Sequence, residues 1–282
     1  MEITATLIKQ LREQTHAGIM DCKKALQASN GDFDEAEKYL KKVGLAAVAK
    51  REGRVTEFGG IFIARNDKAI AMVEITCETD FVAKNESFKA MGNDVARTVV
   101  EKGYTEAVPE LVEKVNALIA TINENMLIKN IYLQQIADDE YVVSYIHGDG
   151  LIGVVVTIKA ADKAAYQNEA FQKLAFNTAL HVCASDPMFL DVKDIPEAYT
   201  AEQTEIFNAQ VASLDKPENV KAGIVRGKLT KLYSEITLLK QEFAIENDDH
   251  VSVEALFAKV GKENGFKATV TKYVRFKAGA TN

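Results

Sequence analysis

The sequence has little cysteine and no long apolar run, and each absence excludes a class of protein. The three cysteines, Cys22, Cys77 and Cys183, are odd in number, far apart and without a metal-binding spacing. We therefore expect free thiols rather than a disulfide framework. No stretch of about 18 apolar residues occurs, and the first residues lack the basic and apolar regions of a signal peptide. We expect no membrane partner and a cytoplasmic location.

Positive charge is also scarce. The chain of 282 residues carries 34 Lys and Arg against 41 Asp and Glu, which gives a net charge of −7. Binding to nucleic acid requires clustered basic residues that neutralise phosphates, so we expect no direct nucleic-acid partner. The proportions of hydrophobic residues (47%) and charged residues (27%) are ordinary for a globular protein. A surface of this charge is better suited to a protein partner.

Motifs of known catalytic sites are missing as well. None of the histidines belongs to a ligand set such as H-E-x-x-H, and no G-x-S-x-G elbow is present. The histidines are His16, His147, His181 and His250. The sequence of residues 223–230 is similar to the motif of a phosphate-binding loop. The segment is one residue short, however, and has Leu229 where Ser or Thr must hold magnesium. We therefore expect a binding protein that is not an enzyme and has no cofactor and no metal site.

The first 45 residues predict three short helices of the kind that serve as a docking module. Met20, Ala25 and Leu26 are available for packing in the second helix. Gly44 is expected to end the third helix. The other expected boundary residues are Thr4 as the first N-cap, Ile19 and Ala28 at the ends of the second helix, and Asp32 or Asp34 as the third N-cap.

Matching residues predict that a hairpin followed by a helix occurs twice in the middle of the chain. Strands are expected around Asn66-Asp67, with a helix at about 85–102. The start of this helix, Asn85-Glu86-Ser87-Phe88, matches Asn168-Glu169-Ala170-Phe171. We interpret this match as a duplicated unit of antiparallel sheet and helix, which predicts an α+β fold. Chance similarity of two amphipathic helices is the alternative.

A coiled-coil hairpin is predicted at 197–247. In its second helix the apolar residues alternate in spacings of four and three, as in a coiled-coil seam. These residues are Val225, Leu229, Leu232, Ile236, Leu239 and Phe243. A last helix after Ser252 and a strand at 268–276 are also expected. We divide the chain into a docking module (1–45), a linker (46–58), a first core subdomain (59–140), a second core subdomain in two parts (141–196 and 248–282), and the hairpin (197–247).

Two segments resemble signature segments of the elongation factor Ts family. They are residues 11–26, LREQTHAGIMDCKKAL, and residues 76–84, TCETDFVAK. Residues 145–148, 181–185 and 273–276 are also similar to that family. The resemblance covers most of the chain, including the three-helix module, the repeated core and the coiled-coil hairpin. His16 stands where the family commonly has glycine.

The resemblance implies guanine-nucleotide exchange on elongation factor Tu in translation elongation. It implies that the chain binds the GTPase domain of elongation factor Tu with GDP, displaces the magnesium there and promotes GDP release. The partner-binding residues that displace this magnesium would be Thr79, Asp80, Phe81 and Val82. Further partner-binding residues would be Arg12, Met20, Lys23 and His147. A homodimer within a larger complex is also compatible with the family.

Other interpretations of the same residues remain open. Phe81 alone could be a core residue at a strand end, and Asp80 could be a helix cap. The first 45 residues also resemble a ubiquitin-associated-like module, so a ribosome-linked chaperone or a scaffold is an alternative function. An enzyme with an unrecognised active site is a further alternative, which a polar pocket in the structure would favour.

Overall fold

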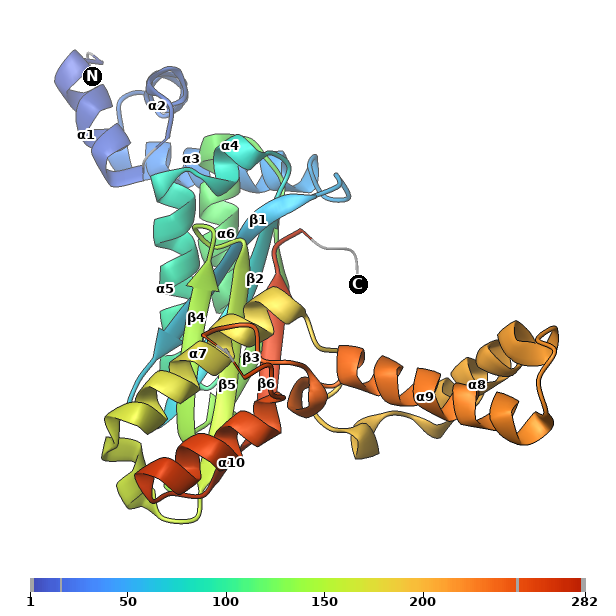
Figure 1. Ribbon diagram of the computed structural model, residues 1–282. Coiled ribbons are helices and arrows are strands. Elements are labelled where there is room, and N and C mark those ends of the chain that lie inside the picture. Colours follow the sequence, from blue (N-terminus) through green and yellow to red (C-terminus); the bar gives the residue numbers. More distant parts are fainter. Residues whose placement is uncertain (1–2, 16, 247–248, 280–282) are drawn as a thin grey trace. The chain divides into compact units, whose positions relative to one another are not determined.

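The structure is a computed structural model that describes residues 3–15, 17–246 and 249–279 (Figure 1). The chain forms two compact units. One comprises Met1–Gln135, Ile146–Ile152 and Phe276–Asn282, and the other comprises Ile136–Tyr145 and Gly153–Arg275. The described residues combine helices with two three-stranded sheets, which confirms the expected α+β class. No helix in these ranges is long and apolar enough to cross a membrane.

Three helices open the first unit: α1 (Ala5–Thr15), α2 (Ile19–Ala28) and α3 (Phe33–Ala49). Thr4 caps α1 by accepting a hydrogen bond from the Leu7 N–H at 3.3 Å, and Asp32 caps α3 through the Glu35 N–H at 2.9 Å. Both caps confirm the sequence prediction. The residues of the small core between the helices are Leu11, Cys22, Ala25, Leu26 and Ala36. His16, between α1 and α2, lies outside the described residues.

Two expectations for these helices are wrong. Met20 does not pack in the core, because 61% of its surface is exposed at the start of α2. The third helix does not end at Gly44 but continues to Ala49. A Cβ atom at Gly44 would lie 3.0 Å from the Cβ atom of Ala120 in α6 (Pro109–Ile122). This glycine therefore permits close packing of α3 on α6 rather than ending a helix.

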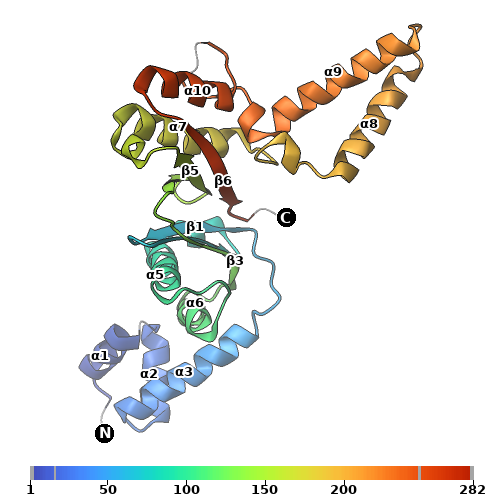
Figure 2. The same cartoon turned by 90° about the horizontal axis from the view of Figure 1, so that it is seen from below.

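The first sheet has the strand order β1 (Phe58–Arg65), β2 (Ala69–Cys77), β3 (Met126–Gln135), and both pairs are antiparallel. Asn66 closes the expected hairpin, since its side-chain oxygen accepts hydrogen bonds from the Lys68 and Ala69 N–H groups. Helix α6 and helix α5 (Glu86–Lys102) lie on one side of this sheet (Figure 2). The core between the sheet and these helices includes Val73, Ile75, Phe88, Val95 and Leu111.

Strand β2 also carries a buried carboxylate, Glu74. It accepts hydrogen bonds from the Asn130 side chain at 2.6 Å and from the Gly279 N–H at 3.1 Å. The turn at 148–150 lies against the start of the same sheet, where the Ile61 N–H donates to the Gly150 carbonyl at 2.8 Å. Segments from distant parts of the sequence therefore complete the surroundings of the first sheet.

The second sheet has the order β4 (Tyr141–His147), β5 (Ile152–Ala160), β6 (Ala268–Lys277). Helices α7 (Glu169–Ser185) and α10 (Val253–Asn264) accompany it. Short 3-10 helices lie at Lys163–Gln167, Val192–Asp194 and Leu238–Lys240.

Elements of the first sheet recur in the second at a constant offset along the chain. Strand β5 corresponds to β2 and α7 to α5, and the corresponding elements have equal lengths. Asn85 caps α5 and Asn168 caps α7, so the two matched segments begin corresponding helices. The aromatic residues Phe88 and Phe171 are both fully buried. Duplication as the origin of this correspondence stays a prediction.

A hairpin of two helices, α8 (Glu197–Ala212) and α9 (Glu218–Ile236), projects within the second unit (Figure 1). The predicted seam is wrong beyond Ile236, because the backbone becomes extended at Thr237 (φ −112°, ψ 117°). Leu239 then lies in a 3-10 helix, and Phe243 is buried beside the ring of His181. The four-three spacing therefore continues past the end of the helix. The domain boundaries stated above stay a prediction.

Candidate functional site

The segment Thr79–Val82 forms a compact turn between β2 and α5, where the short helix α4 (Asp80–Ala83) begins. Thr79 is its N-cap, and its hydroxyl accepts a hydrogen bond from the Val82 N–H at 3.4 Å. Val82 is buried in the core of the first sheet, whereas 81% of Phe81 is exposed. A cap and a buried valine therefore hold one aromatic side chain in solvent.

Hydrogen bonds from neighbouring segments also fix the conformation of the turn. The Glu124 carboxylate accepts hydrogen bonds from the Thr79 hydroxyl at 2.8 Å and from the Thr79 N–H at 3.1 Å. The Cys77 thiol donates to the Thr79 carbonyl at 3.2 Å. Burial raises the pKa of Cys77 to about 12, so the thiol keeps its proton at neutral pH. Every polar backbone or side-chain group of Thr79 thus has a partner.

Asp80 follows Thr79 and lies beside Lys84, with 2.7 Å between carboxylate oxygen and ammonium nitrogen. The hydrogen bond from Lys84 lowers the pKa of Asp80 below its ordinary value, so the carboxylate is ionised at neutral pH. Thr79, rather than Asp80, caps the helix. An ionised carboxylate and an exposed aromatic ring are therefore neighbours on a fixed turn.

Exposure of Phe81 contradicts its interpretation as a core residue. Phenylalanine is among the residues most often buried, so a ring that the turn holds in water is available for an interaction. No pattern in the sequence distinguishes the exposed Phe81 from the fully buried Phe88. The structure makes this distinction.

His147 ends β4 and is exposed, with the exposed Ile146 beside it. The following turn has positive φ at Gly148, Asp149 and Gly150. The Asp149 carboxylate binds Lys89 in the first turn of α5, with 2.7 Å between the charged atoms. Helix α5 follows α4 almost directly, so the structure brings the His147 turn and the Phe81 turn to the same end of α5.

The three predicted docking residues of the N-terminal helices lie elsewhere in the first unit. Arg12 is exposed on α1, and Met20 and Lys23 are exposed on α2. Ile19, beside Met20, is exposed as well. These residues form an accessible surface on α1 and α2, whereas α4 packs on β1 and β2. Their role in partner binding stays a prediction.

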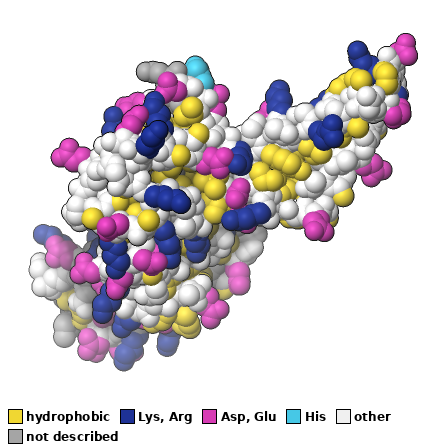
Figure 3. All heavy atoms as spheres, turned by 60° about the horizontal axis from the view of Figure 1, so that its bottom comes forward, with side chains coloured by type: hydrophobic (Ala, Val, Ile, Leu, Met, Phe, Trp, Pro, Cys, Tyr) yellow, Lys and Arg dark blue, Asp and Glu magenta, His cyan; other side chains and the backbone are white. Residues whose placement is uncertain are grey.

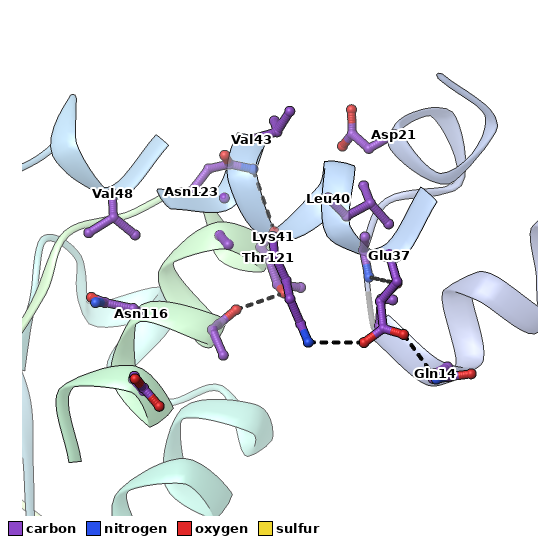
Figure 4. A pocket seen from close by; sticks show the side chains of 16 residues that line it. Gln14, Asp21, Glu37, Leu40, Lys41, Val43, Val48, Asn116, Thr121 and Asn123 are labelled. Carbon is purple, nitrogen blue, oxygen red and sulfur yellow. Dashed lines mark hydrogen bonds and ion pairs between the residues drawn. The ribbon is translucent and has the colours of Figure 1, made fainter. Parts of the chain in front are cut away.

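A cavity of about 660 Å³ lies between α3 and α6 (Figure 4). Its hydroxyl groups are engaged, because Thr15 donates to the Leu11 carbonyl and Thr121 donates to the Ala117 carbonyl. Glu37 is paired with Lys41 at 3.1 Å and accepts a hydrogen bond from Gln14. Among the residues that the structure describes, no histidine or cysteine lines this cavity. The enzyme interpretation stays an alternative that this lining does not test.

Metal ligands do not gather elsewhere in the described ranges, where no group of three or more His, Cys, Asp or Glu could hold an ion. The helical hairpin α8–α9 offers a different kind of surface. Figure 3 shows hydrophobic side chains gathered along it, with acidic and basic side chains around them. Ile206, Leu214 and Val220 are its exposed large apolar residues.

Sequence reasoning missed Glu124, which binds Thr79, and the connector residues Arg51 and Arg54 near it. Arg51 donates to the Asn123 backbone carbonyl at 2.9 Å, and Arg54 lies 3.4 Å from Glu78. A lone glutamate after a helix and two arginines in a linker have no distinctive spacing. Only the fold brings them next to the Phe81 turn.

Comparison with known proteins gives one consistent result. The family model described as Elongation factor TS matches residues 78–280. A relative named Elongation factor Ts from Treponema denticola is 46% identical over 99% of this chain and 99% of the relative. Proteins of the same name from Borrelia recurrentis and Treponema pallidum are 41% and 40% identical, over 93% and 99% of this chain and 94% and 99% of their own lengths.

Proposed function

The chain belongs to the elongation factor Ts family, and on this premise we propose that it is a guanine-nucleotide exchange factor for elongation factor Tu. It binds elongation factor Tu with GDP bound, displaces the magnesium ion of the GTPase domain and promotes GDP release during translation elongation. It acts by binding rather than as an enzyme, in the cytoplasm where translation takes place.

The observation that carries this proposal is the exposed Phe81 ring on a rigid turn. Insertion of the ring between elements of the GTPase removes its apolar surface from water. Full burial of a phenylalanine side chain contributes roughly 1.5–3 kcal/mol. Because about 1.4 kcal/mol corresponds to a tenfold change in affinity, this one contact accounts for a loss of nucleotide affinity of about one to two powers of ten.

Asp80 acts on the magnesium site in this proposal. Its carboxylate is ionised, and its ion pair with Lys84 is partly exposed to solvent. Surface ion pairs are weak, so this pair opens at little cost when the partner docks. A negative charge then enters the surroundings of a Mg²⁺ ion that holds the phosphates of GDP, and the ligands of that ion rearrange.

Arg12, Met20, Lys23 and His147 supply further contacts with the partner. They support the docking of the chain, whereas the Thr79–Val82 turn disturbs the nucleotide site. Thr79 and Val82 hold the turn in shape for Asp80 and Phe81. Energetic coupling is reciprocal, so GDP weakens binding of this chain to the GTPase by the same factor by which the chain weakens GDP.

Release of a fluorescent GDP analogue from elongation factor Tu tests the proposal. The chain is added in substoichiometric amount, and the decay of fluorescence is recorded with and without it. Acceleration that discharges several equivalents of nucleotide per chain is the expected result. Unchanged release from the partner of the same organism would reject the proposal and favour the chaperone or scaffold function.

A further inference from the structure

The Phe81 turn is connected by hydrogen bonds to a segment 45 residues further along the chain. Glu124 follows the last turn of α6 and places both carboxylate oxygens on Thr79. Hydrogen bonds to an ionised group are about twice as strong as neutral ones, and two of them fix the direction of Thr79. Since Thr79 is the N-cap of α4, its direction determines the direction in which α4 presents Phe81.

Glu124 is in turn positioned by its neighbours. Asn123 ends α6 in a left-handed conformation (φ 68°). Arg51, from the connector after α3, donates to the Asn123 carbonyl at 2.9 Å and to the Asn123 side-chain oxygen at 2.8 Å. A left-handed residue that is held at both oxygens cannot turn without breaking these bonds.

The residue after Glu124 is held in the same way. The Asn125 N–H donates to the Glu78 carboxylate at 2.6 Å, and the Asn125 side chain donates to the Arg54 carbonyl at 2.8 Å. Arg54 also pairs with Glu78. Residues 123–125, which we name the α6–β3 turn, therefore join the connector on one side to Glu78 and Thr79 on the other.

We propose that Glu124 is a positioning residue that holds the Thr79–Val82 turn so that Phe81 projects into solvent, and that Arg51 and Arg54 fix Glu124 through the α6–β3 turn. This inference rests on the proposed exchange function for its consequence, but its structural part can be tested without the partner. Loss of Glu124 leaves the docking residues of α1 and α2 in place and removes one of the constraints on the turn that carries Phe81.

The first test measures the mobility of the turn in the isolated full-length chain. The sequence contains no tryptophan, so Phe81→Trp introduces a single indole reporter. We compare its fluorescence anisotropy alone, with Glu124→Ala and with Glu124→Gln. The anisotropy is expected to fall with Glu124→Ala and to fall less with Glu124→Gln, because the amide oxygen of glutamine still accepts one hydrogen bond.

Asp162→Ala is the matched control. Asp162 caps the corresponding turn after β5 by accepting a hydrogen bond from the Ala164 N–H at 2.9 Å, and it is far in sequence from the Phe81 turn. Its loss removes a cap without removing the support of Phe81. The indole anisotropy and the exchange rate should both stay unchanged. Thermal unfolding followed by circular dichroism checks that each variant is folded.

The second test measures exchange with native Phe81. In Glu124→Ala the maximal rate of GDP release is expected to fall about tenfold. This factor corresponds to the free energy of one hydrogen bond to a charged group. The concentration of elongation factor Tu that gives half the maximal rate should change much less. Arg51→Ala should also lower the maximal rate, by a smaller factor, since its hydrogen bonds to Asn123 reach Thr79 indirectly through Glu124.

The possible outcomes separate this inference from the proposed function. Unchanged anisotropy in Glu124→Ala overturns the inference. Lower anisotropy with an unchanged maximal rate overturns it as well, because exchange then does not require a fixed turn. A complete lack of exchange by the unsubstituted chain rejects the proposed function instead, while the anisotropy still decides whether Glu124 holds the turn.

Discussion

After β2 the chain presents Phe81 to solvent, whereas after β5 the corresponding position holds Ala164. The two turns share a capping residue and a buried apolar residue at corresponding positions. Thr79 and Asp162 are both caps, and Val82 and Ala165 are both buried in their cores. The first turn is α-helical and the second is a 3-10 helix, and they carry an exposed aromatic ring and a methyl group at corresponding positions.

The second turn directs its aromatic residue inward instead. Tyr166 donates its hydroxyl to the Asp139 carbonyl at 2.6 Å, and its ring lies 5.3 Å from that of Phe171. Its counterpart in the first unit is Ala83. In both units the repeated elements bury an apolar core, whereas of the two turns only the one after β2 exposes a large aromatic side chain.

The largest expected effect concerns Phe81 itself. Phe81→Ala should lower the maximal rate of GDP release by about one to two powers of ten, because the burial of the ring is lost. The apparent free energy of unfolding should hardly change, since the ring is exposed in the folded chain. Stopped-flow release of a fluorescent GDP analogue and chemical denaturation measure the two quantities.

Grafting the ring onto the other turn supplies the control for this variant. Ala164→Phe places a phenylalanine at the corresponding exposed position after β5. Combined with Phe81→Ala, it should not restore exchange. Full recovery would show that any exposed phenylalanine suffices and would remove the distinction between the two turns.

A second comparison concerns the packing of α5 and α7. Gly92 of α5 corresponds to Ala175 of α7, and a Cβ atom at Gly92 would lie 2.2 Å from the Phe62 ring. Gly92→Ala should therefore lower the free energy of unfolding by about 1–3 kcal/mol through overpacking, although alanine favours helix. Chemical denaturation measures the change. Phe62→Leu in the same chain should recover part of the loss, and a stabilised single variant would contradict the assigned clash.

A third comparison concerns pH. His181 of α7 is fully buried and corresponds to Thr98 of α5. Its Nε2 atom donates to the Gln241 side-chain oxygen at 3.0 Å, and its Nδ1 atom accepts from the Ala244 N–H at 3.0 Å. Burial lowers the pKa of His181 below its ordinary value of 6.5. The folded chain therefore keeps this imidazole neutral.

The sign of the effect follows from proton linkage. Below pH 6.5 the unfolded chain binds a proton at His181 that the folded chain does not. Stability should fall with decreasing pH by up to about 1.4 kcal/mol per pH unit until the folded pKa is reached. Denaturation curves between pH 7 and pH 5, compared with those of His181→Gln, isolate this contribution. Equal pH dependence in both chains would contradict it.

The smallest expected effect comes from the two helix caps. The Asn168 side-chain oxygen accepts two N–H groups, at 2.9 Å and 3.2 Å, whereas that of Asn85 accepts one at 2.8 Å. Each substitution by alanine should cost about 1 kcal/mol, with the larger loss at Asn168. Differential scanning calorimetry ranks the two. Only Asn85→Ala should also slow exchange, because α4 ends beside it.

The periodic parts of the fold were predictable from the sequence. The strands expected around Asn66-Asp67 and the N-cap expected at Asp32 are elements that the structure confirms, because local patterns determine local elements. Gly44 misled the prediction since its function is tertiary: it permits contact with Ala120, which no local pattern reveals. Leu239 misled it because a four-three spacing persists where the backbone has already left the helix.

The candidate site was predictable only in part. The resemblance of residues 76–84 identified Asp80 and Phe81, but composition alone left Phe81 as a core residue. Its exposure depends on the cap at Thr79 and the burial of Val82. Glu124 could not be predicted, since its contact with Thr79 joins segments that only the completed first sheet brings together.

The hydrogen bonds of Glu74 limit how early the first unit can complete its folding during synthesis on the ribosome. Its strand is synthesised early, yet one of its hydrogen-bond donors is the backbone of Gly279, and the sheet that contains it also needs Gly150. Domains generally fold as their residues emerge, at about 5–20 residues per second. The first unit therefore waits many seconds for these contacts, and the Glu74 carboxylate lacks the Gly279 donor until the end of the chain has been synthesised.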